Sequence, residues 1–281
     1  MSRAQKRPPK LEPRAHEAPP AAPPTLEELL ERAKIAGRGG SGPGPTELRR
    51  TLERLVRGDR RALGEIAPID GLMVDGAWKA VDETYGATAD IVVIDAARTL
   101  AAIRAARAHV QKVAATGARI AIATSAPASL LTLHLAFARL AQAQGGEVVD
   151  LVDFGPIRAD GRAGRSLRWF SGVAVVSDGD GLCATRDGEA AREWLFAMPR
   201  PALVIADGPF AEVAWENGID VVAFAGLDRL GLAVAAARRG AGIVVPMRTD
   251  LPARSYRVLE EIVAGDDADP SARGSGPEGG L

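Results

Sequence analysis

Hydrophobic runs and helical stretches alternate along most of this chain. From residue 90 onward, short apolar runs recur, and amphipathic or alanine-rich stretches of helical length separate them. Unbroken apolar strands of this kind are typical of a parallel sheet that is covered by helices on both faces. The pattern therefore predicts an α/β fold with a mostly parallel, doubly wound sheet in three layers. The expected strands span residues 91–95, 118–124, 147–154, 167–170, 173–177, 202–207, 220–226 and 241–247.

The part of the chain ahead of the sheet has a different pattern. Residues 1–24 contain seven prolines and almost no large apolar side chains, which predicts a disordered tail. Thr25 and Glu28 then form the signature of a helix capping box, and Thr46 begins a second amphipathic stretch. The expected division is a tail over 1–24, a short helical N-terminal segment over 25–69, an α/β domain over 70–264 and a second disordered tail over 265–281.

Composition narrows the class of protein. The 281 residues carry 35 Lys and Arg against 36 Asp and Glu, a formal net charge of -1. A balance this close to neutral lacks the basic surface by which proteins bind nucleic acid. Cys183 is the single cysteine, which excludes an intrachain disulfide framework and a cysteine-based zinc cluster.

The apolar runs are too short to cross a membrane, and the charged, proline-rich N-terminus lacks the apolar core of a secretion signal. We therefore expect a cytoplasmic protein that binds neither a membrane nor nucleic acid. A homodimer is compatible with its alanine-rich helices.

Polar side chains follow four of the expected strands, where each strand ends. In doubly wound, Rossmann-like sheets, ligands bind outside the carboxyl ends of the strands. Carboxylates there suit a hard divalent cation such as Mg²⁺, and hydroxyl groups beside a helix N-terminus suit a phosphate. The candidate metal ligands are Asp95, Asp178, Asp180 and Asp207, and the candidate hydroxyl groups are Thr124 and Ser125.

A second interpretation of these residues stays open. An Asp directly after a strand is often the N-cap of the next helix. Asp178 and Asp180, in the sequence Asp-Gly-Asp-Gly, also fit a tight turn.

The order of these strand ends resembles that of the haloacid dehalogenase (HAD) phosphatases. VVIDAARTL carries Asp95 and Thr99, IAIATS carries Thr124 and Ser125, and VIADGPFAEVAWENGIDVVAF resembles the late acidic loop. The resemblance implies that Asp95 is a nucleophile that forms an aspartyl-phosphate. It also implies that Thr124 or Ser125 holds the phosphoryl oxygens and that late acidic residues hold Mg²⁺.

The chain departs from that pattern at three points. Ala97 stands where the general-acid Asp belongs, Ala211 stands where a second late Asp often lies, and no Lys follows residue 112. Protonation of the leaving group therefore has no evident agent in the HAD scheme.

A second resemblance, to a little-studied bacterial phosphatase family, extends over almost all of residues 70–263. It rests on DGAWKAVDETYGATADIVVIDAARTL, IAIATSAPASLL, DFGP, GVAVVSDGDGL, EWLFAMPRPALVIADGPFAEVA and VVAFAGLD. This resemblance implies an α/β domain and phosphatase activity, without assigning roles to residues.

Two further features favour structural roles. His134 lies in LLTLHLAFARLAQ and is interpreted as a helix-face histidine rather than a base. A glycine-broken basic stretch is interpreted as a surface loop, with binding of an anionic substrate as the alternative; it carries Arg158, Arg162, Arg165 and Arg168.

These observations together predict a Mg²⁺-dependent phosphatase of a small phosphorylated metabolite. Asp95 and Thr124 are the expected catalytic residues, and Ser125 and Arg98 are expected to bind the substrate. Two alternatives remain. One is a non-catalytic ligand-binding or regulatory module, and the other is a different α/β enzyme, such as a sugar or nucleotide transferase.

Overall fold

A single mixed sheet forms the centre of the protein. The computed structural model describes residues 23–37 and 43–265, so residues 1–22 and 266–281, where the disordered tails are expected, lie outside it. The described residues form a nine-stranded sheet. Its strands are β1 (Arg119–Ala123), β2 (Glu147–Val148), β3 (Phe154–Ala159), β4 (Arg162–Phe170), β5 (Val173–Ser177), β6 (Leu182–Cys183), β7 (Leu203–Asp207), β8 (Asp220–Ala225) and β9 (Ile243–Pro246).

The sheet is mostly parallel, as the sequence predicts. Its order is β3-β4-β5-β1-β7-β8-β9, with β2 beside β1 and β6 beside β5. Strand β1 pairs in parallel with β2, β5 and β7, and the parallel pairing continues through β8 to β9. Antiparallel pairing is confined to the side of the sheet that holds β3, β4 and β6. Every residue of β5 and β7 is buried, which accounts for their continuous apolar sequences.

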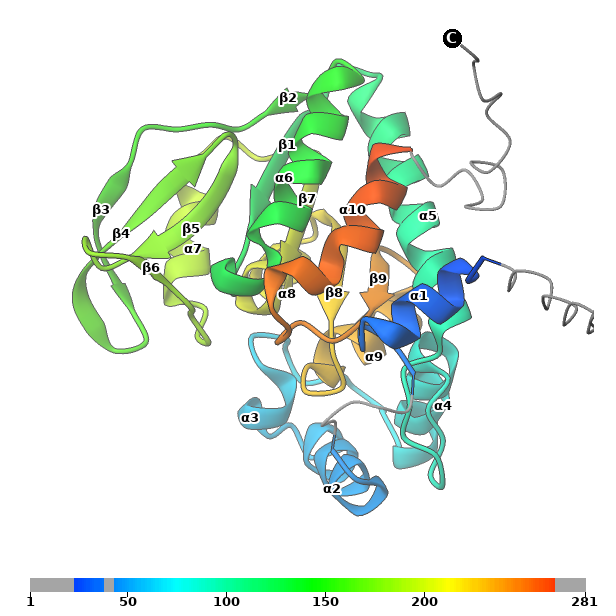
Figure 1. The fold of residues 1–281 in the computed structure, drawn as a ribbon. Coiled ribbons are helices and arrows are strands. Elements are labelled where there is room, and N and C mark those ends of the chain that lie inside the picture. The colour runs from blue at the N-terminus through cyan, green and yellow to red at the C-terminus, as the bar shows by residue number, and fades with distance from the viewer. Residues whose placement is uncertain (1–22, 38–42, 266–281) are drawn as a thin grey trace, which may run out of the picture.

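Helices cover both faces of the sheet. Helices α5, α6 and α10 pack on one another on one face, together with α1, whereas α7, α8 and α9 lie on the other (Figure 1). The helices are α1 (Leu26–Arg32), α2 (Pro45–Val56), α3 (Arg60–Leu63), α4 (Val74–Tyr85), α5 (Ala96–Ala114), α6 (Pro127–Ala143), α7 (Glu189–Phe196), α8 (Gly208–Glu216), α9 (Leu230–Arg239) and α10 (Arg257–Ala264), with a 3-10 helix, η1, at Ala253–Tyr256. The result is the three-layer α/β architecture that the sequence predicts.

From β1 the chain adds strands toward one edge of the sheet, and from β7 it adds them toward the other edge. Helix α6 follows β1 and leads toward β5, whereas α8 follows β7 and leads the other way, toward β8. Because such crossovers are right-handed, the two helices leave on opposite faces of the sheet. The carboxyl ends of β1 and β7 therefore form the topological switch point, where doubly wound sheets bind ligands.

Helices α2 and α3 pack beside the carboxyl edge of the sheet. In Figure 1, α2 and α3 lie at the lower end of the molecule, next to α9 and α4. The sequence of α2 buries Leu48, Leu52 and Leu55, which are spaced along one helical face. The backbone of α3 approaches α9 so closely that a Cβ built on Gly231 would lie 2.6 Å from the carbonyl oxygen of Leu63.

The prediction of a strand at residues 91–95 is wrong. Within that run, Ile94 makes an isolated bridge to Gly37, and Ile91 is 45% exposed. The backbone N–H of Asp95 donates to the carbonyl oxygen of Tyr85 at 2.8 Å, at the end of α4. The run is held by these contacts with the end of α4 and with Gly37, and the sheet ends at β9.

Two other expectations need correction. The expected strand at 147–154 is divided into β2 and the start of β3. The basic stretch after it is a β-hairpin, β3–β4, rather than a loop, and it buries Ile157 and Leu167. The expected hairpin of β4 and β5 is confirmed. Ser171 and Gly172, with φ of 49° and 86°, form its turn.

No helix in the described part of the chain is both long enough and apolar enough to cross a membrane.

The close contact of α3 with α9 predicts opposite effects for two Gly-to-Ala substitutions within helices. Gly231→Ala should destabilise the protein by about 1–3 kcal/mol, because the new Cβ would meet the Leu63 backbone. Gly76→Ala in α4 is the matched control, since its Cβ would meet only Leu72 Cδ1 at 3.8 Å. It should stabilise by about 0.5–1 kcal/mol through helix propensity. Urea unfolding measures the free energy of unfolding of both variants. An equal increase for the two variants would contradict the predicted clash with Leu63.

Candidate functional site

Two adjoining cavities lie at the carboxyl edge of the sheet. The first, of about 310 Å³, is bounded by the turns after β8 and β9, and the second, of about 370 Å³, by α3 and the turn after β8. Arg186 and Asp228 line both cavities, which therefore form one site, here named the carboxyl-edge crevice. The first cavity is lined by residues 35–37, 43, 92–94, 186, 226–228 and 248–250, and the second by residues 60–62, 64, 65, 186, 187, 228 and 229.

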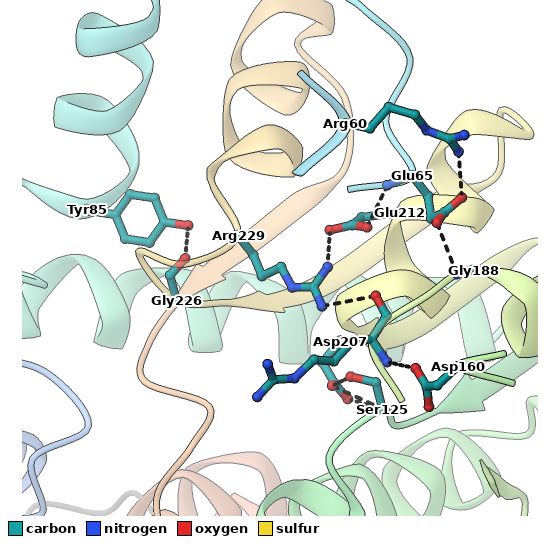
Figure 2. Close-up of polar contacts among 11 residues, drawn as sticks. Arg60, Glu65, Tyr85, Ser125, Asp160, Gly188, Asp207, Glu212, Gly226 and Arg229 are labelled. Carbon is teal, nitrogen blue, oxygen red and sulfur yellow. Dashed lines mark hydrogen bonds and ion pairs between the residues drawn. The ribbon is translucent and has the colours of Figure 1, made fainter. Parts of the chain in front are cut away.

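Two buried tyrosines hold the turns that form the crevice. Tyr85 Oη donates to the carbonyl oxygen of Gly226 at 3.1 Å, which joins α4 to the end of β8 (Figure 2). Tyr256 Oη donates to the carbonyl oxygen of Arg248 and accepts from Leu251 N–H, both at 3.0 Å. Burial raises the pKa of both phenols, so each stays a hydrogen-bond donor throughout the neutral range.

Most of the arginines around the crevice have acidic partners. Arg248 makes a two-pronged contact with Asp250, at 3.0 and 2.9 Å. Arg229 lies 3.3 Å from Glu212, and Arg60 lies 3.7 Å from Glu65. The exposed side chain of Arg186, by contrast, makes no hydrogen bond or ion pair with another described residue. A guanidinium group without a partner in a crevice is suited to a carboxylate or phosphate ligand.

The backbone of Arg186 is held from both sides. Its N–H donates to Asp160 Oδ1 at 2.8 Å, and its carbonyl oxygen accepts from Arg229 Nη2 at 3.5 Å. Asp160, at the turn of the β3–β4 hairpin, also accepts from Arg165 Nη1 at 2.6 Å. Burial alone would raise the pKa of Asp160, but the Arg186 N–H and the Arg165 guanidinium lower it. The hairpin therefore holds the segment that carries Arg186.

Glu212 on α8 supports the other side of the crevice. Its carboxylate accepts from Glu65 N–H at 2.9 Å, which joins α8 to the end of α3. Gly64, with φ of 68°, allows this approach, since a Cβ there would lie 2.3 Å from Glu212 Oε2. Burial raises the pKa of Glu212 against the opposing effect of Arg229.

Ser125 and Asp207 meet at the switch point between β1 and β7. The backbone N–H of Ser125 lies 3.2 Å from both carboxylate oxygens of Asp207, and Ser125 Oγ donates to Asp207 Oδ2 (Figure 2). Gly208 has φ of 52°, and a Cβ there would lie 2.5 Å from Ser125 Oγ. Ser125 and Asp207 are 7% and 2% exposed. Thr124 is buried beside them and accepts from Ala126 N–H at 3.1 Å. The strand-end pattern therefore identified residues that the fold brings together.

Asp95 and Arg98 lie at the N-terminus of α5, outside the lining of the crevice. Asp95 is the N-cap of α5: its Oδ1 accepts from Ala97 N–H at 2.8 Å and from Arg98 N–H at 3.3 Å. Arg98 donates to the backbone carbonyl of Asp82 and lies 3.5 Å from its carboxylate. A cap and an ion pair account for these contacts, and the catalytic and substrate-binding roles stay predictions.

Asp178 and Asp180 form a turn after β5. The Asp178 carboxylate accepts from Gly181 N–H at 2.9 Å and from Asp180 N–H at 3.2 Å. The Gly181 N–H, followed by the Cys183 thiol and then the Asp180 N–H, lowers the pKa of Asp178. The turn interpretation therefore explains both positions, which are exposed.

The expected metal ligands do not gather. Among the described residues, no three His, Cys, Asp or Glu side chains are placed to hold a metal ion together. Asp95, Asp178, Asp180 and Asp207 therefore do not fit a metal centre built by the protein alone. Mg²⁺ commonly takes one or two carboxylates together with water and substrate oxygens, so a Mg²⁺ requirement stays a prediction.

Sequence reasoning missed four residues of interest. Asp228 and Arg248 follow β8 and β9, so the strand-end rule would have identified them if it had been applied to these two strands as well. Arg186 carries no such signal, because it lies in the loop after β6. His134 of α6 lies with its Nε2 3.5 Å from Asp207 Oδ1, and no sequence spacing indicates that contact.

Two comparisons with known proteins indicate the family of this chain. A family model described as Phosphatase matches residues 25–266. The chain belongs to this phosphatase family. A curated relative, Phosphatase SCO2771 of Streptomyces coelicolor (strain ATCC BAA-471 / A3(2) / M145), is 29% identical over 159 residues, which are 55% of this chain. The match spans 59% of the length of that relative. The bacterial phosphatase resemblance is thus confirmed, whereas these matches do not bear on the HAD pattern.

The Asp160 contacts predict a pH-dependent effect of Asp160→Asn. A carboxyl group whose pKa is lowered by folding stabilises the fold above its unfolded pKa of about 3.9, and that stabilisation is lost as the pH falls through the folded-state pKa. Asp160→Asn should therefore cost about 1 kcal/mol at pH 7, and the difference from wild type should vanish on acidification. Asp153→Asn is the control, because Asp153 is 58% exposed and 3.8 Å from Arg168. A loss that does not change with pH would contradict this account.

Proposed function

We propose that this protein is a phosphatase that hydrolyses a small phosphorylated metabolite bound in the carboxyl-edge crevice. The observation that carries the proposal is the Arg186 side chain, which is unpaired among the described residues and lines a crevice at the carboxyl ends of the parallel strands. Membership of the phosphatase family supports the reaction class. The two cavities, of about 310 and 370 Å³, suit a small ligand.

The two sides of the crevice differ in how they can meet an anion. Arg186 is free to form a new two-pronged contact with a phosphoryl group. The guanidinium of Arg248 already donates two hydrogen bonds to Asp250. It therefore attracts an anion through its charge rather than through those hydrogen bonds. Asp228 lines both cavities, and its carboxylate disfavours a highly charged anion beside it. This arrangement favours a monoester whose phosphoryl group approaches Arg186.

Arg186→Ala should raise KM for the phosphorylated substrate by about 10- to 100-fold, because a charge-assisted contact contributes about 1.5–3 kcal/mol. The measurement is phosphate release from a panel of phosphorylated metabolites. Arg238→Ala, an exposed arginine in the last turn of α9, is the matched control and should leave KM unchanged. Absence of phosphate release by folded wild-type protein on the whole panel would contradict the proposal and favour the ligand-binding module.

The same assay tests the metal requirement. Turnover that is lost in EDTA and restored by Mg²⁺ would support the expected Mg²⁺-dependence, and equal turnover in both conditions would contradict it.

Asp95→Asn separates a helix cap from a nucleophile. Asn caps helices as well as Asp does, so we expect this variant to keep both its stability and its turnover. Asp95→Ala removes the cap and should cost about 1 kcal/mol. Phosphate release and thermal unfolding measure the two effects. Abolished turnover in a stable Asp95→Asn variant would contradict the cap interpretation and identify Asp95 as catalytic.

A further inference from the structure

The second cavity of the carboxyl-edge crevice is rich in arginine. Three segments of the chain, α3, the loop after β6 and the turn after β8, supply arginines to its lining. These are Arg60, Arg61, Arg186 and Arg229. Two of the four, Arg60 and Arg229, are paired with carboxylates. The other two, Arg61 and Arg186, come from opposite segments of the lining, α3 and the loop after β6.

The guanidinium of Arg61 is exposed and unpaired. The adjacent carboxylate of Asp59, the N-cap of α3, accepts from Arg61 N–H and from Arg54 Nε, both at 2.8 Å. The Arg61 guanidinium itself makes no hydrogen bond or ion pair with another described residue. Arg61 therefore joins Arg186 as a second guanidinium group of this cavity that can bind an anionic ligand.

The carboxylates of the crevice differ from one another in the same way. Asp250 is paired with Arg248. Glu65 and Asp187 accept hydrogen bonds from backbone N–H groups at 3.0 and 3.1 Å. The exposed carboxylate of Asp228, by contrast, makes no hydrogen bond or ion pair with another described residue. Among the described acidic residues that line the crevice, Asp228 is thus the one whose carboxylate is unpaired.

The Asp228 carboxylate lies on the side of the first cavity. A Cβ built on Gly226 would lie 2.5 Å from Asp228 Oδ1, and Gly226 lines the first cavity only. Burial, with a smaller contribution from the charge of Asp228, raises the pKa of the Tyr85 phenol. That phenol donates its proton to the carbonyl oxygen of Gly226, so it does not serve the carboxylate (Figure 2).

The crevice therefore presents separated charges of opposite sign. Arg186 and Asp228 line the same two cavities without forming an ion pair with each other. A ligand complementary to this arrangement carries an anionic and a cationic group at different points. Between these points the first cavity offers an apolar wall, formed by residues 35, 36 and 92–94, for the carbon atoms of the ligand.

We propose that the crevice binds a phosphate monoester that carries an amine, with the phosphoryl group between Arg61 and Arg186 in the second cavity and the ammonium group against Asp228 in the first. This inference rests on the proposed function and names its substrate class. The ammonium group donates a charge-assisted hydrogen bond to the Asp228 carboxylate. A hydroxyl group in the same place donates a hydrogen bond but does not offset the negative charge, so the amine is preferred over the hydroxyl.

The first experiment compares esters that differ only by an amine or a hydroxyl group. The pairs are 2-aminoethyl phosphate with 2-hydroxyethyl phosphate, and glucosamine 6-phosphate with glucose 6-phosphate. Wild-type protein should hydrolyse the amine ester with a kcat/KM at least about 10-fold above that of its hydroxyl counterpart. Asp228→Asn should abolish this preference by slowing hydrolysis of the amine ester alone. Asp75→Asn is the matched control, because Asp75 is an exposed residue of α4 that lines neither cavity.

The second experiment measures binding without turnover. In 3-aminopropylphosphonate a methylene replaces the ester oxygen of 2-aminoethyl phosphate, so the compound cannot be hydrolysed as an ester. Calorimetry should give wild-type protein a Kd for it at least about 10-fold below that for 3-hydroxypropylphosphonate, and Asp228→Asn should make the two Kd values equal.

Arg61→Ala tests the place of the phosphoryl group. It should raise the Kd of both phosphonates alike, by about 10-fold, because the group that Arg61 binds is common to them. Arg238→Ala on α9 is the control and should leave both Kd values unchanged. Unchanged binding in Arg61→Ala would overturn the placement of the phosphoryl group in the second cavity.

The outcomes separate the two proposals. A preference for the amine in neither assay, or one that persists in Asp228→Asn, would overturn the substrate class. If wild-type protein then releases phosphate from other esters, the proposed function stands. Absence of turnover on every ester, together with Asp228-dependent binding of 3-aminopropylphosphonate, would overturn the phosphatase and retain the ligand class.

Discussion

The hydrogen bonds between Ser125 and Asp207 are the contacts on which the carboxyl edge of the sheet depends. They join the ends of the two central strands, β1 and β7, at the point where α6 and α8 diverge. A carboxylate that is 2% exposed requires hydrogen-bond donors, and Ser125 supplies a backbone and a side-chain donor. The glycine after Asp207 allows this approach, because any Cβ at that position would lie against Ser125 Oγ.

Most of the arginine side chains around the crevice are paired with an acidic side chain. Arg248, Arg229 and Arg60 each have an acidic partner, and buried Glu212 binds both Arg229 and the backbone of α3. These contacts hold the turns in place rather than bind a ligand. Arg186 differs, because the protein holds its backbone through Asp160 and Arg229 while its guanidinium makes no hydrogen bond or ion pair with another described residue. An anionic ligand binds well to a guanidinium group whose backbone is fixed in place and whose charge is not already paired with a carboxylate.

The sequence predicted the sheet well and the site only in part. Strands such as β5 and β7 are buried on both faces, so their composition alone identifies them. Residues 91–95 have a similar apolar composition, yet Ile94 makes only an isolated bridge to Gly37. Apolar composition predicts burial, but it does not predict whether a segment pairs with a strand. The strand-end rule found Ser125 and Asp207, yet it also selected Asp95 and Asp178, which cap a helix and form a turn. Which strand ends meet depends on the order of strands, and that order arises from tertiary packing.

The helical N-terminal segment over 25–69 and the α/β domain over 70–264, expected as separate segments, share one hydrophobic core. Leu48, Leu52 and Leu63 belong to the same buried cluster as the strands, and α3 lines the second cavity of the crevice. The family match also begins at Thr25, ahead of the helices. Because Glu65 N–H binds Glu212 and Leu63 lies against Gly231, movement of α3 would displace α8 and α9 together. Helix α3 and residues 35–37 therefore form part of the wall of the crevice, and its shape depends on their packing.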